Sequence, residues 1–395
     1  MDDKTKILIA TSLGHFVNDG FLVLFPLLIV YYIKMGVNSA LLGVLAAAIS
    51  LLSGLLSTPI GSLADRRGNY GGLMVVGLSL LVASSALYSL TFALPQLALP
   101  LIAASSALLG FGLAFYHQLG AAMLQVEFGG DAPKALGING SLGSLGRALF
   151  PSILVFLIVS LGPSLGLLSV ALYNAAIVLA ILAMLRGTRF GPRAAPAQAK
   201  PGASRGVRAS AVMPLIALVF IRSIFFTGVL TYVPTYLVDT YRSDVLMGAV
   251  LTISYATAII GQPLFGRLTS RYGGLSMVAL TTVVPTIVFV AFLSVPNEIL
   301  SLALFAAYSF FAMSGFPVLL GYVGQIVGRE DLSRANALVW GLGNMVGGSI
   351  GALIGGPLLS AVGAAYLMWI YAAFGVVSII FIPQLLMWGA GSPRR

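Results

Sequence analysis

The sequence contains no cysteine and very few charged residues. Only 8% of its 395 residues are Asp, Glu, Lys or Arg, whereas a soluble domain carries about 25%. Because so few charges cannot cover a water-facing surface of this size, a soluble enzyme, a nucleic-acid-binding protein and a disordered protein are excluded. The absence of cysteine excludes disulfides, thiolate metal sites and cysteine nucleophiles.

Long apolar runs dominate the chain instead. Hydrophobic residues make up 59% of it, and the mean hydropathy is +1.02. A membrane-spanning helix needs about 20 mostly apolar residues. Twelve such runs are present: 7–33, 40–62, 71–91, 95–126, 134–160, 164–186, 211–238, 245–268, 274–295, 297–326, 334–362 and 364–388. We therefore predict an all-α integral membrane protein with twelve transmembrane helices.

The basic residues gather on one side of these predicted helices. With both termini in the cytoplasm, 17 of the 21 Lys and Arg residues fall on the cytoplasmic side, and only Lys34 and Arg242 fall on the other. Cytoplasmic loops carry such an excess of positive charge. The sequence thus predicts a multi-pass protein of the cell membrane with both termini in the cytoplasm. The net charge of +10 then reflects topology and needs no nucleic-acid partner.

The chain divides into two similar halves. Residues 187–210 are rich in Pro, Gly, Ala and Arg and cannot bury a core, so we predict six-helix halves over 1–186 and 211–395 joined by a cytoplasmic linker. A loop at 61–68 recurs at 266–273, after a further 205 residues. Both halves begin in the cytoplasm, so the repeats are parallel. In transporters built this way, the substrate site lies at the interface of the halves near the membrane midplane.

The repeated loop resembles a known family signature. Residues 61–68 read Gly-Ser-Leu-Ala-Asp-Arg-Arg-Gly, which is similar to the signature loop of the major facilitator superfamily. Asn69 and Tyr70 replace the cations that end that signature. The resemblance implies the major facilitator fold, and it implies that the loop controls the conformational change. The residues expected in this gate are Gly61, Asp65, Arg66, Arg67 and Gly68, with Arg267 and Arg271 in the second copy.

Two further segments resemble the fosmidomycin-resistance-like branch of this superfamily. They are His15-Phe16-Val17-Asn18-Asp19 in the first predicted span and Ala114-Phe115-Tyr116-His117 in the fourth. Arg222, Pro317 and Gln325 add to the resemblance. This branch contains drug/proton antiporters, so the resemblance implies proton-coupled efflux.

Polar residues inside the spans are the clearest candidates for a site. His15, Asn18 and Asp19 share one helix face, and His117, Arg147 and Arg222 lie at similar depths in other spans. Charges inside a membrane are costly and usually mark pathways for ions or substrates. We expect Asp19 to pair with Arg222, with Arg147 as the competing partner. The alternative is a purely structural cluster in which the histidines donate to backbone carbonyls.

The residue types divide this set by role. Imidazole titrates near neutral pH, so we assign Asp19, His15 and His117 to proton coupling. Two arginines against one aspartate favour an anionic substrate, because guanidinium binds carboxylate or phosphate with two hydrogen bonds. The predicted substrate-binding residues are Asn18, Arg147, Arg222, Tyr232, Trp340 and Asn344. For the aromatic residues, simple helix packing is the alternative, and for the glycine rows of the fifth and eleventh spans we favour close helix contact.

The sequence therefore predicts a transporter and not an enzyme. It has no Gly-rich Lys loop for ATP, and no metal-binding spacing or nucleophile motif of a hydrolase. We expect a monomeric, proton-coupled secondary transporter without cofactor or metal, which exports a small compound or drug by alternating access. The two arginines favour an anionic compound. The alternatives are a proton-linked uptake permease, a receptor of the same shape that does not transport, and a hydrolase embedded in the membrane.

Overall fold

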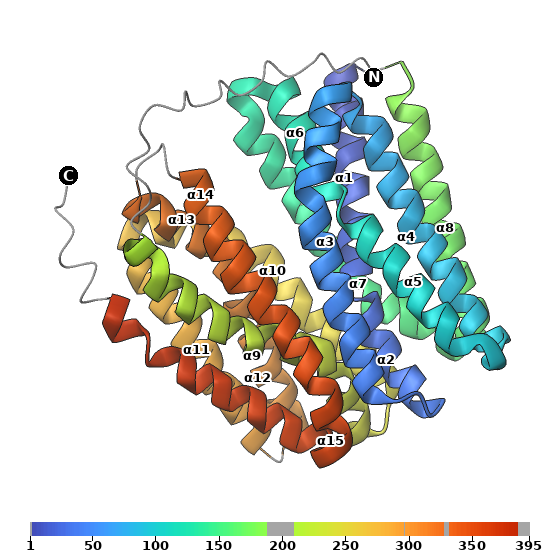
Figure 1. Cartoon of the computed structure of the whole chain (residues 1–395), viewed down its shortest axis with the longest axis vertical. Coiled ribbons are helices and arrows are strands. Elements are labelled where there is room, and N and C mark those ends of the chain that lie inside the picture. The colour runs from blue at the N-terminus through green and yellow to red at the C-terminus, as the bar shows by residue number, and fades with distance from the viewer. Residues whose placement is uncertain (1, 188–208, 296, 328–331, 386–395) are drawn as a thin grey trace. The chain divides into compact units, whose positions relative to one another are not determined.

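The computed structural model describes residues 2–187, 209–295, 297–327 and 332–385, and within them every regular element is a helix (Figure 1). The α-helices are α1 (Asp3–Leu22), α2 (Leu24–Lys34), α3 (Ser39–Arg67), α4 (Tyr70–Ala93), α5 (Ala98–Leu113), α6 (Tyr116–Phe128), α7 (Ala132–Leu161), α8 (Pro163–Leu185), α9 (Ala209–Tyr241), α10 (Asp244–Tyr272), α11 (Gly274–Ser294), α12 (Glu298–Met313), α13 (Gly315–Ile326), α14 (Leu332–Leu338) and α15 (Gly347–Ile379). A π-helix, η3 (Val339–Val346), joins α14 to α15, and 3₁₀ turns η1 (Pro95–Leu97) and η2 (Gly129–Asp131) flank α5 and α6. Most of the predicted linker lies outside the described residues.

The helices account for the predicted spans. The described residues contain ten stretches that are long and apolar enough to cross a membrane. Two of them, Pro95–Leu161 and Ala335–Leu385, have 67 and 51 residues, and each contains two of the predicted spans. The second is divided at Gly363, whose φ of 79° interrupts the helix. The predicted all-α membrane fold is therefore confirmed.

Several spans are broken within their length. The first changes from α1 to α2 at Val23, and the fourth changes from α5 to α6 at Ala114 and Phe115. The tenth breaks in the same way at Ser314, between α12 and α13. The breaks in the fourth and tenth spans lie 200 residues apart. These corresponding breaks agree with the internal repeat.

The chain forms two units. The first contains residues 1–37, 48–198 and 241–252, and the second contains 38–47, 199–240 and 253–395. The first residues of α3 therefore pack with the second unit. Ser39 Oγ donates to the carbonyl of Gly356 at 2.7 Å, and a side chain on Gly356 would collide with the backbone of Ser39.

Glycines bring α1 and α7 into close contact in the first unit. A Cβ on Gly146 would overlap the carbonyl oxygen of Phe16, and one on Gly143 would overlap the imidazole of His15. Small residues let helix backbones approach in this way. The glycines of α7 thus let the backbones of α1 and α7 approach closely, so that polar side chains of α7 can contact α1. Gly143 also leaves room for the ring of His15.

The second unit repeats this contact with a local shift. A Cβ on Gly347 would overlap the carbonyl oxygen of Phe220, and Gly343 faces Val219 in the same manner. Gly143 and Gly343 are 200 residues apart, but Gly146 and Gly347 are 201 apart. The π-helix η3 supplies the additional residue, because a π-bulge accommodates one extra residue in a helix.

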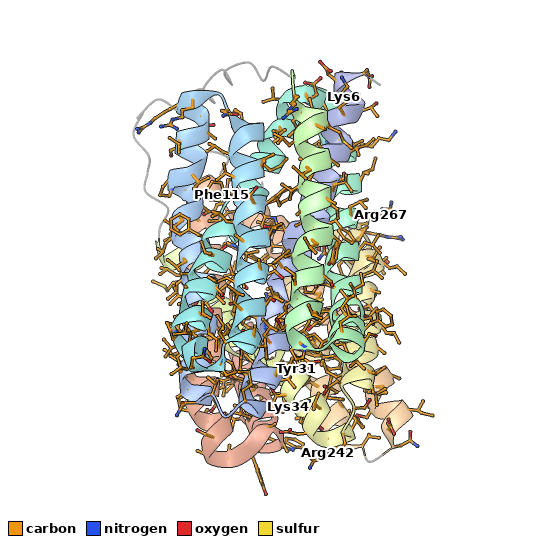
Figure 2. The ribbon with its side chains drawn as sticks, turned by 90° about the vertical axis from the view of Figure 1, so that its right-hand side faces the viewer. Lys6, Tyr31, Lys34, Phe115, Arg242 and Arg267 are labelled. Carbon is orange, nitrogen blue, oxygen red and sulfur yellow. The ribbon has the colours of Figure 1, made fainter. Side chains whose placement is uncertain are left out.

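The two basic residues predicted on the far side of the membrane lie together at one end of the first unit. Figure 2 shows Lys34 and Arg242 at the end opposite Lys6. Lys34 Nζ contacts the carboxylate of Asp244 at 2.8 Å. The separation of these cations from Lys6 agrees with the charge pattern of the sequence, and the side of the membrane stays a prediction.

Candidate functional site

Asp19 is the centre of a charged cluster in the first unit. It lies on α1, and only 2% of its surface is exposed. Arg147 Nη2 donates to its Oδ2 at 2.5 Å. The other oxygen, Oδ1, lies 3.4 Å from His15 Nε2 and 3.6 Å from His117 Nε2. The structure thus brings together His15, Asp19, His117 and Arg147, from α1, α6 and α7.

The partner of Asp19 within the first unit is Arg147, which the sequence left open as the competitor of Arg222. Arg147 Nη2 donates to the carboxylate. The reason is the glycine contact described above, which brings Arg147 of α7 against α1. Similar depth in the membrane did not single out Arg147, because it gives no information on which helices touch.

A chain of hydrogen bonds fixes the orientation of His15. Tyr116 Oη donates to the carbonyl of Thr11 at 2.6 Å, and that carbonyl can only accept. The Tyr116 oxygen then accepts from Asn139 Nδ2 at 2.8 Å. This leaves Asn139 Oδ1, an acceptor, 2.8 Å from His15 Nδ1. His15 Nδ1 must therefore carry a proton and donate it to Asn139.

The opposite ring nitrogen of His15 faces the carboxylate. In a neutral imidazole with a proton on Nδ1, Nε2 carries a lone pair. This Nε2 lies 3.4 Å from Asp19 Oδ1, so two acceptors lie close together. A proton on Nε2 places a positive charge beside the carboxylate, which attracts it. Nε2 is therefore the nitrogen of His15 that a second proton would occupy.

His117 and Asn18 complete the cluster. The side chain of His117 is 52% exposed, whereas Asp19 is buried. Asn18 Nδ2 lies 3.3 Å from Asp19 Oδ1 and 3.3 Å from His117 Nε2. Asn18 Oδ1 is buried and has no hydrogen-bond partner among the described residues. His117 is thus the exposed member of the cluster, and Asn18 connects it to the carboxylate.

The cluster has the residue types of a metal site. One ligand atom from each of His15, Asp19 and His117 lies within 4.8 Å of the others. A guanidinium already occupies Oδ2 of the same carboxylate, and it would repel a divalent cation beside it. The guanidinium therefore disfavours a metal ion at this cluster.

Sequence reasoning missed Asn139 and the role of Tyr116. Both are buried, and both act through His15. Tyr116 is part of the segment that resembles the family branch, but that resemblance gave it no role. For Asn139 the available signal was a polar side chain one turn before Gly143, on the helix face that touches α1.

Arg222 lies in the second unit, and no ion pair joins it to an acidic residue in the described part of that unit. It is 3% exposed, and its Nη1 donates to Thr282 Oγ1 at 3.3 Å. Its guanidinium lies 5.4 Å from the ring centre of Phe226, a cation–π contact. Its Nε has no hydrogen-bond partner among the described residues. Arg222 is thus a buried cation with spare donors.

The other predicted substrate residues also lie in the second unit. Asn344 accepts a hydrogen bond from Ser223 Oγ at 3.0 Å, and Trp340 packs edge-on against Phe316 with ring centres 4.8 Å apart. Both belong to η3, and π-helical turns occur frequently at functional sites. Tyr232 differs, because it is fully buried and its hydroxyl donates to the carbonyl of Ala352. In this structure Tyr232 packs between helices, the alternative that the sequence left open.

The signature loop ends α3 and leads into α4. Gly68 has a φ of 64°, which favours glycine. Tyr70 Oη donates to Asp65 at 2.6 Å, and Asn69 caps α4 by accepting from the amide of Gly72 at 3.0 Å. These contacts explain how the loop is held without the usual trailing cations. Arg66 and Arg67 are exposed, and Gly61 is half-buried. In the second copy Arg267 is exposed, and Arg271 packs on the ring of Tyr272.

Similar solved structures share this fold. The first is the nucleoside transporter NupG in a variant form, with a TM-score of 0.76 and 15% identity over 97% of this chain and 100% of that chain. A bacterial homologue of the human lysosomal transporter Spinster has a TM-score of 0.74 and 14% identity, over 99% of this chain and 96% of that chain. The human organic anion transporter MFSD10 has a TM-score of 0.66 and 17% identity, over 97% of this chain and 100% of that chain. At these identities the likeness shows the fold alone.

Comparison at the level of sequence families gives the same result. No curated protein matches the sequence significantly. The model of the Major Facilitator Superfamily, however, matches residues 7–249 and 242–394, nearly the whole chain. Its signature loop and its all-helical fold agree with this match. The chain therefore belongs to the major facilitator superfamily of membrane transporters.

Proposed function

We propose that the protein is a proton-coupled secondary transporter that exports a small anionic compound by alternating access. The observation that carries the proton coupling is the contact between His15 Nε2 and Asp19 Oδ1 at 3.4 Å. The chain from Thr11 through Tyr116 and Asn139 sets the tautomer of His15 so that this nitrogen is free to take up a proton.

The neighbours of His15 assign the roles within the cluster. Arg147 keeps the Asp19 carboxylate charged, so the mobile proton resides on imidazole and not on the aspartate. The groups that face His15 are Asp19 on its own helix, Tyr116 and His117 from α6, and Arg147 from α7. His117 is exposed and exchanges the proton with water.

Export is the direction that the family branch supports. The segments around His15 and His117 resemble drug/proton antiporters, and an inward proton gradient would drive such an antiporter to expel its substrate. Proton-linked uptake is the alternative, and the sign of the gradient distinguishes the two. We also propose that the protein acts as a monomer in the cell membrane with both termini in the cytoplasm, as the Lys and Arg pattern predicts.

We assign the signature loop a role in switching between states. Asp65 is held by Tyr70 at the end of α3, so a change in the position of α3 is transmitted to α4. The exposed guanidinium groups of Arg66 and Arg67 are available for contacts that differ between states. The second copy lacks the aspartate and contributes Arg267 and Arg271 alone.

Proteoliposomes test the coupling residue directly. A labelled compound chosen by a thermal-shift screen of small anions and drugs supplies the substrate. We expect His15→Gln to abolish accumulation driven by a proton gradient and to retain exchange of labelled for unlabelled substrate, because exchange moves no net proton. His117→Gln should slow driven transport more than exchange. Driven transport by His15→Gln at the wild-type rate, with unchanged pH dependence, would overturn the assignment.

A further inference from the structure

We propose that the free edge of the Arg222 guanidinium binds the oxyanion head of the substrate, and that the substrate is an organic anion with an aromatic or other flat apolar group. This inference rests on the proposed transport function and names its substrate class. It places the anion site in the second unit, apart from the proton cluster of the first.

The internal repeat shows why the second unit has no aspartate directly after Arg222 on α9. The matching glycine contacts align Phe16 with Phe220. They therefore align Asn18 with Arg222 and Asp19 with Ser223, each 204 residues later. The second unit has a guanidinium where the first has an amide, and a hydroxyl where the first has the carboxylate.

Acidic residues are scarce inside the predicted spans of the sequence. Of the 11 acidic residues, Asp19 alone lies in the middle of a predicted span. The others lie in loops or near helix ends. Arginine stays protonated in proteins, and a charge buried without a partner is costly. An anion that binds beside Arg222 therefore pairs with a buried guanidinium that has no acidic partner in the described part of the second unit.

The guanidinium presents one particular edge to such an anion. Nη1 is occupied by Thr282, and that hydroxyl also donates to the carbonyl of Val278 at 2.7 Å. Nε has no partner, and Nη2 makes no hydrogen bond with a described residue. Nε and Nη2 together form a fork that fits the two oxygens of a carboxylate or phosphonate.

Aromatic rings beside this edge indicate the rest of the ligand. Phe226 lies against the guanidinium. Gly315 lies at the break between α12 and α13. A Cβ at this position would stand 3.7 Å from Arg222 Nη2, so the absence of a side chain leaves space beside the guanidinium. The next residue, Phe316, is 45% exposed and packs edge-on against Trp340 of η3. An anion with a flat apolar group can therefore place its head on Arg222 and its ring near Phe316 and Trp340.

Binding to the purified full-length protein tests this site without any proton gradient. The probes are benzoate and phenylphosphonate, with benzamide as the uncharged ligand of the same shape, all at equal ionic strength. The readouts are the thermal midpoint and the fluorescence of Trp340 in a background with the other two tryptophans changed to Phe. We expect both anions, but not benzamide, to raise the midpoint and change the fluorescence.

Arg222→Gln and a matched arginine change locate the binding. Arg222→Gln should weaken anion binding at least about tenfold, because hydrogen bonds to charged groups are lost. Arg186→Gln, at an exposed helix end, should leave binding unchanged. The unliganded midpoint of Arg222→Gln should equal or exceed that of the wild type, because an uncompensated buried charge is removed. Arg222→Lys keeps the charge without the fork and should bind with intermediate affinity.

The outcomes separate this inference from the proton site. Anion binding that survives His15→Gln and is lost in Arg222→Gln supports it, even if transport proves independent of protons. No response to either anion, equal binding by Arg222→Gln, or a response to benzamide as large as to benzoate overturns it. The inference is also contradicted if Arg222→Gln has a lower thermal midpoint without ligand while Arg222→Lys binds the anions as the wild type does. Arg222 would then be a structural cation.

Discussion

At the scale of single residues, the two oxygens of Asp19 have different neighbours. Oδ2 accepts from Arg147 and Oδ1 faces the two imidazoles. The arginine keeps the carboxylate ionised, while the histidines compete for a proton on its other side. Asp19 can therefore stabilise a protonated imidazole without itself taking up the proton.

A double-mutant cycle measures the contact between Asp19 and Arg147. Asp19→Asn or Arg147→Gln alone should lower the free energy of unfolding by about 3–5 kcal/mol, because each leaves a buried charge without its partner. The double variant should lose less than the sum, with a coupling of about 0.5–3 kcal/mol. Unfolding in detergent provides the measurement.

The control for this cycle is the pair of Asp19→Asn with Arg222→Gln. These two changes should add within about 0.5 kcal/mol. Additive losses for Asp19 and Arg147 would contradict the ion pair that the structure places there. Coupling between Asp19 and Arg222 instead would restore the partner that the sequence favoured.

The sequence indicated most members of this cluster but not their pairing. Charged and polar side chains inside apolar spans identified Asp19, His15, His117 and Arg147, because such residues are rare there. The pairing depends on which helices touch and on how each is rotated, and depth along a helix does not determine either. Asn139 was missed because a single amide in a span has no pattern of its own.

At the scale of helices, glycine positions set the distance between α1 and α7. Gly137 and Gly146 lie on the same helix, but a Cβ on Gly146 would overlap the Phe16 carbonyl, while one on Gly137 would have no atom within 4 Å. Replacing glycine by alanine should therefore change the stability of the protein in opposite directions at the two positions.

Gly146→Ala should destabilise the protein and separate Arg147 from Asp19. Overpacking typically costs about 1–3 kcal/mol. Gly137→Ala should be neutral or stabilising by about 0.5–1 kcal/mol, because alanine favours a helix interior. Thermal midpoints of the two variants give the comparison. Equal midpoints for both would show that the close contact does not limit the packing of α7.

The apolar runs located the helices well, whereas their interruptions were not predictable. Runs of about 20 residues placed the spans because the bilayer fixes their length. The structure breaks the helices at Val23, Phe115 and Ser314 and forms the π-helix η3. No proline or turn pattern marks η3. The only signal in the sequence is that the glycine row of the eleventh span has one residue more than that of the fifth, between Gly343 and Gly347.

At the scale of the whole molecule, parallel halves give the protein two related sites with different chemistry. The first unit holds a carboxylate, a guanidinium and both histidines of the chain, and the second holds Arg222 alone among buried charges of the described residues. In our proposal, divergence between the repeats separates proton binding from anion binding. One conformational change would then link the two.

Whole cells test the direction of that linked movement. Under an inward proton gradient, cells that express the protein should accumulate less of the substrate than cells that express Asp19→Asn. An ionophore that collapses the gradient should raise accumulation to the level of the variant. A fall in accumulation after collapse would show uptake, the alternative direction.

The central claim is that His15 takes up a proton on Nε2 opposite Asp19, and ¹⁵N-histidine NMR tests it most directly. The chain has only two histidines, so His117→Gln leaves the signal of His15 alone. We predict a ring that carries its single proton on Nδ1 and that takes up a second proton on Nε2 when the sample is acidified. Tyr116→Phe should weaken the preference for that tautomer. A neutral ring protonated on Nε2, or a ring that takes up no second proton on acidification, would contradict the account.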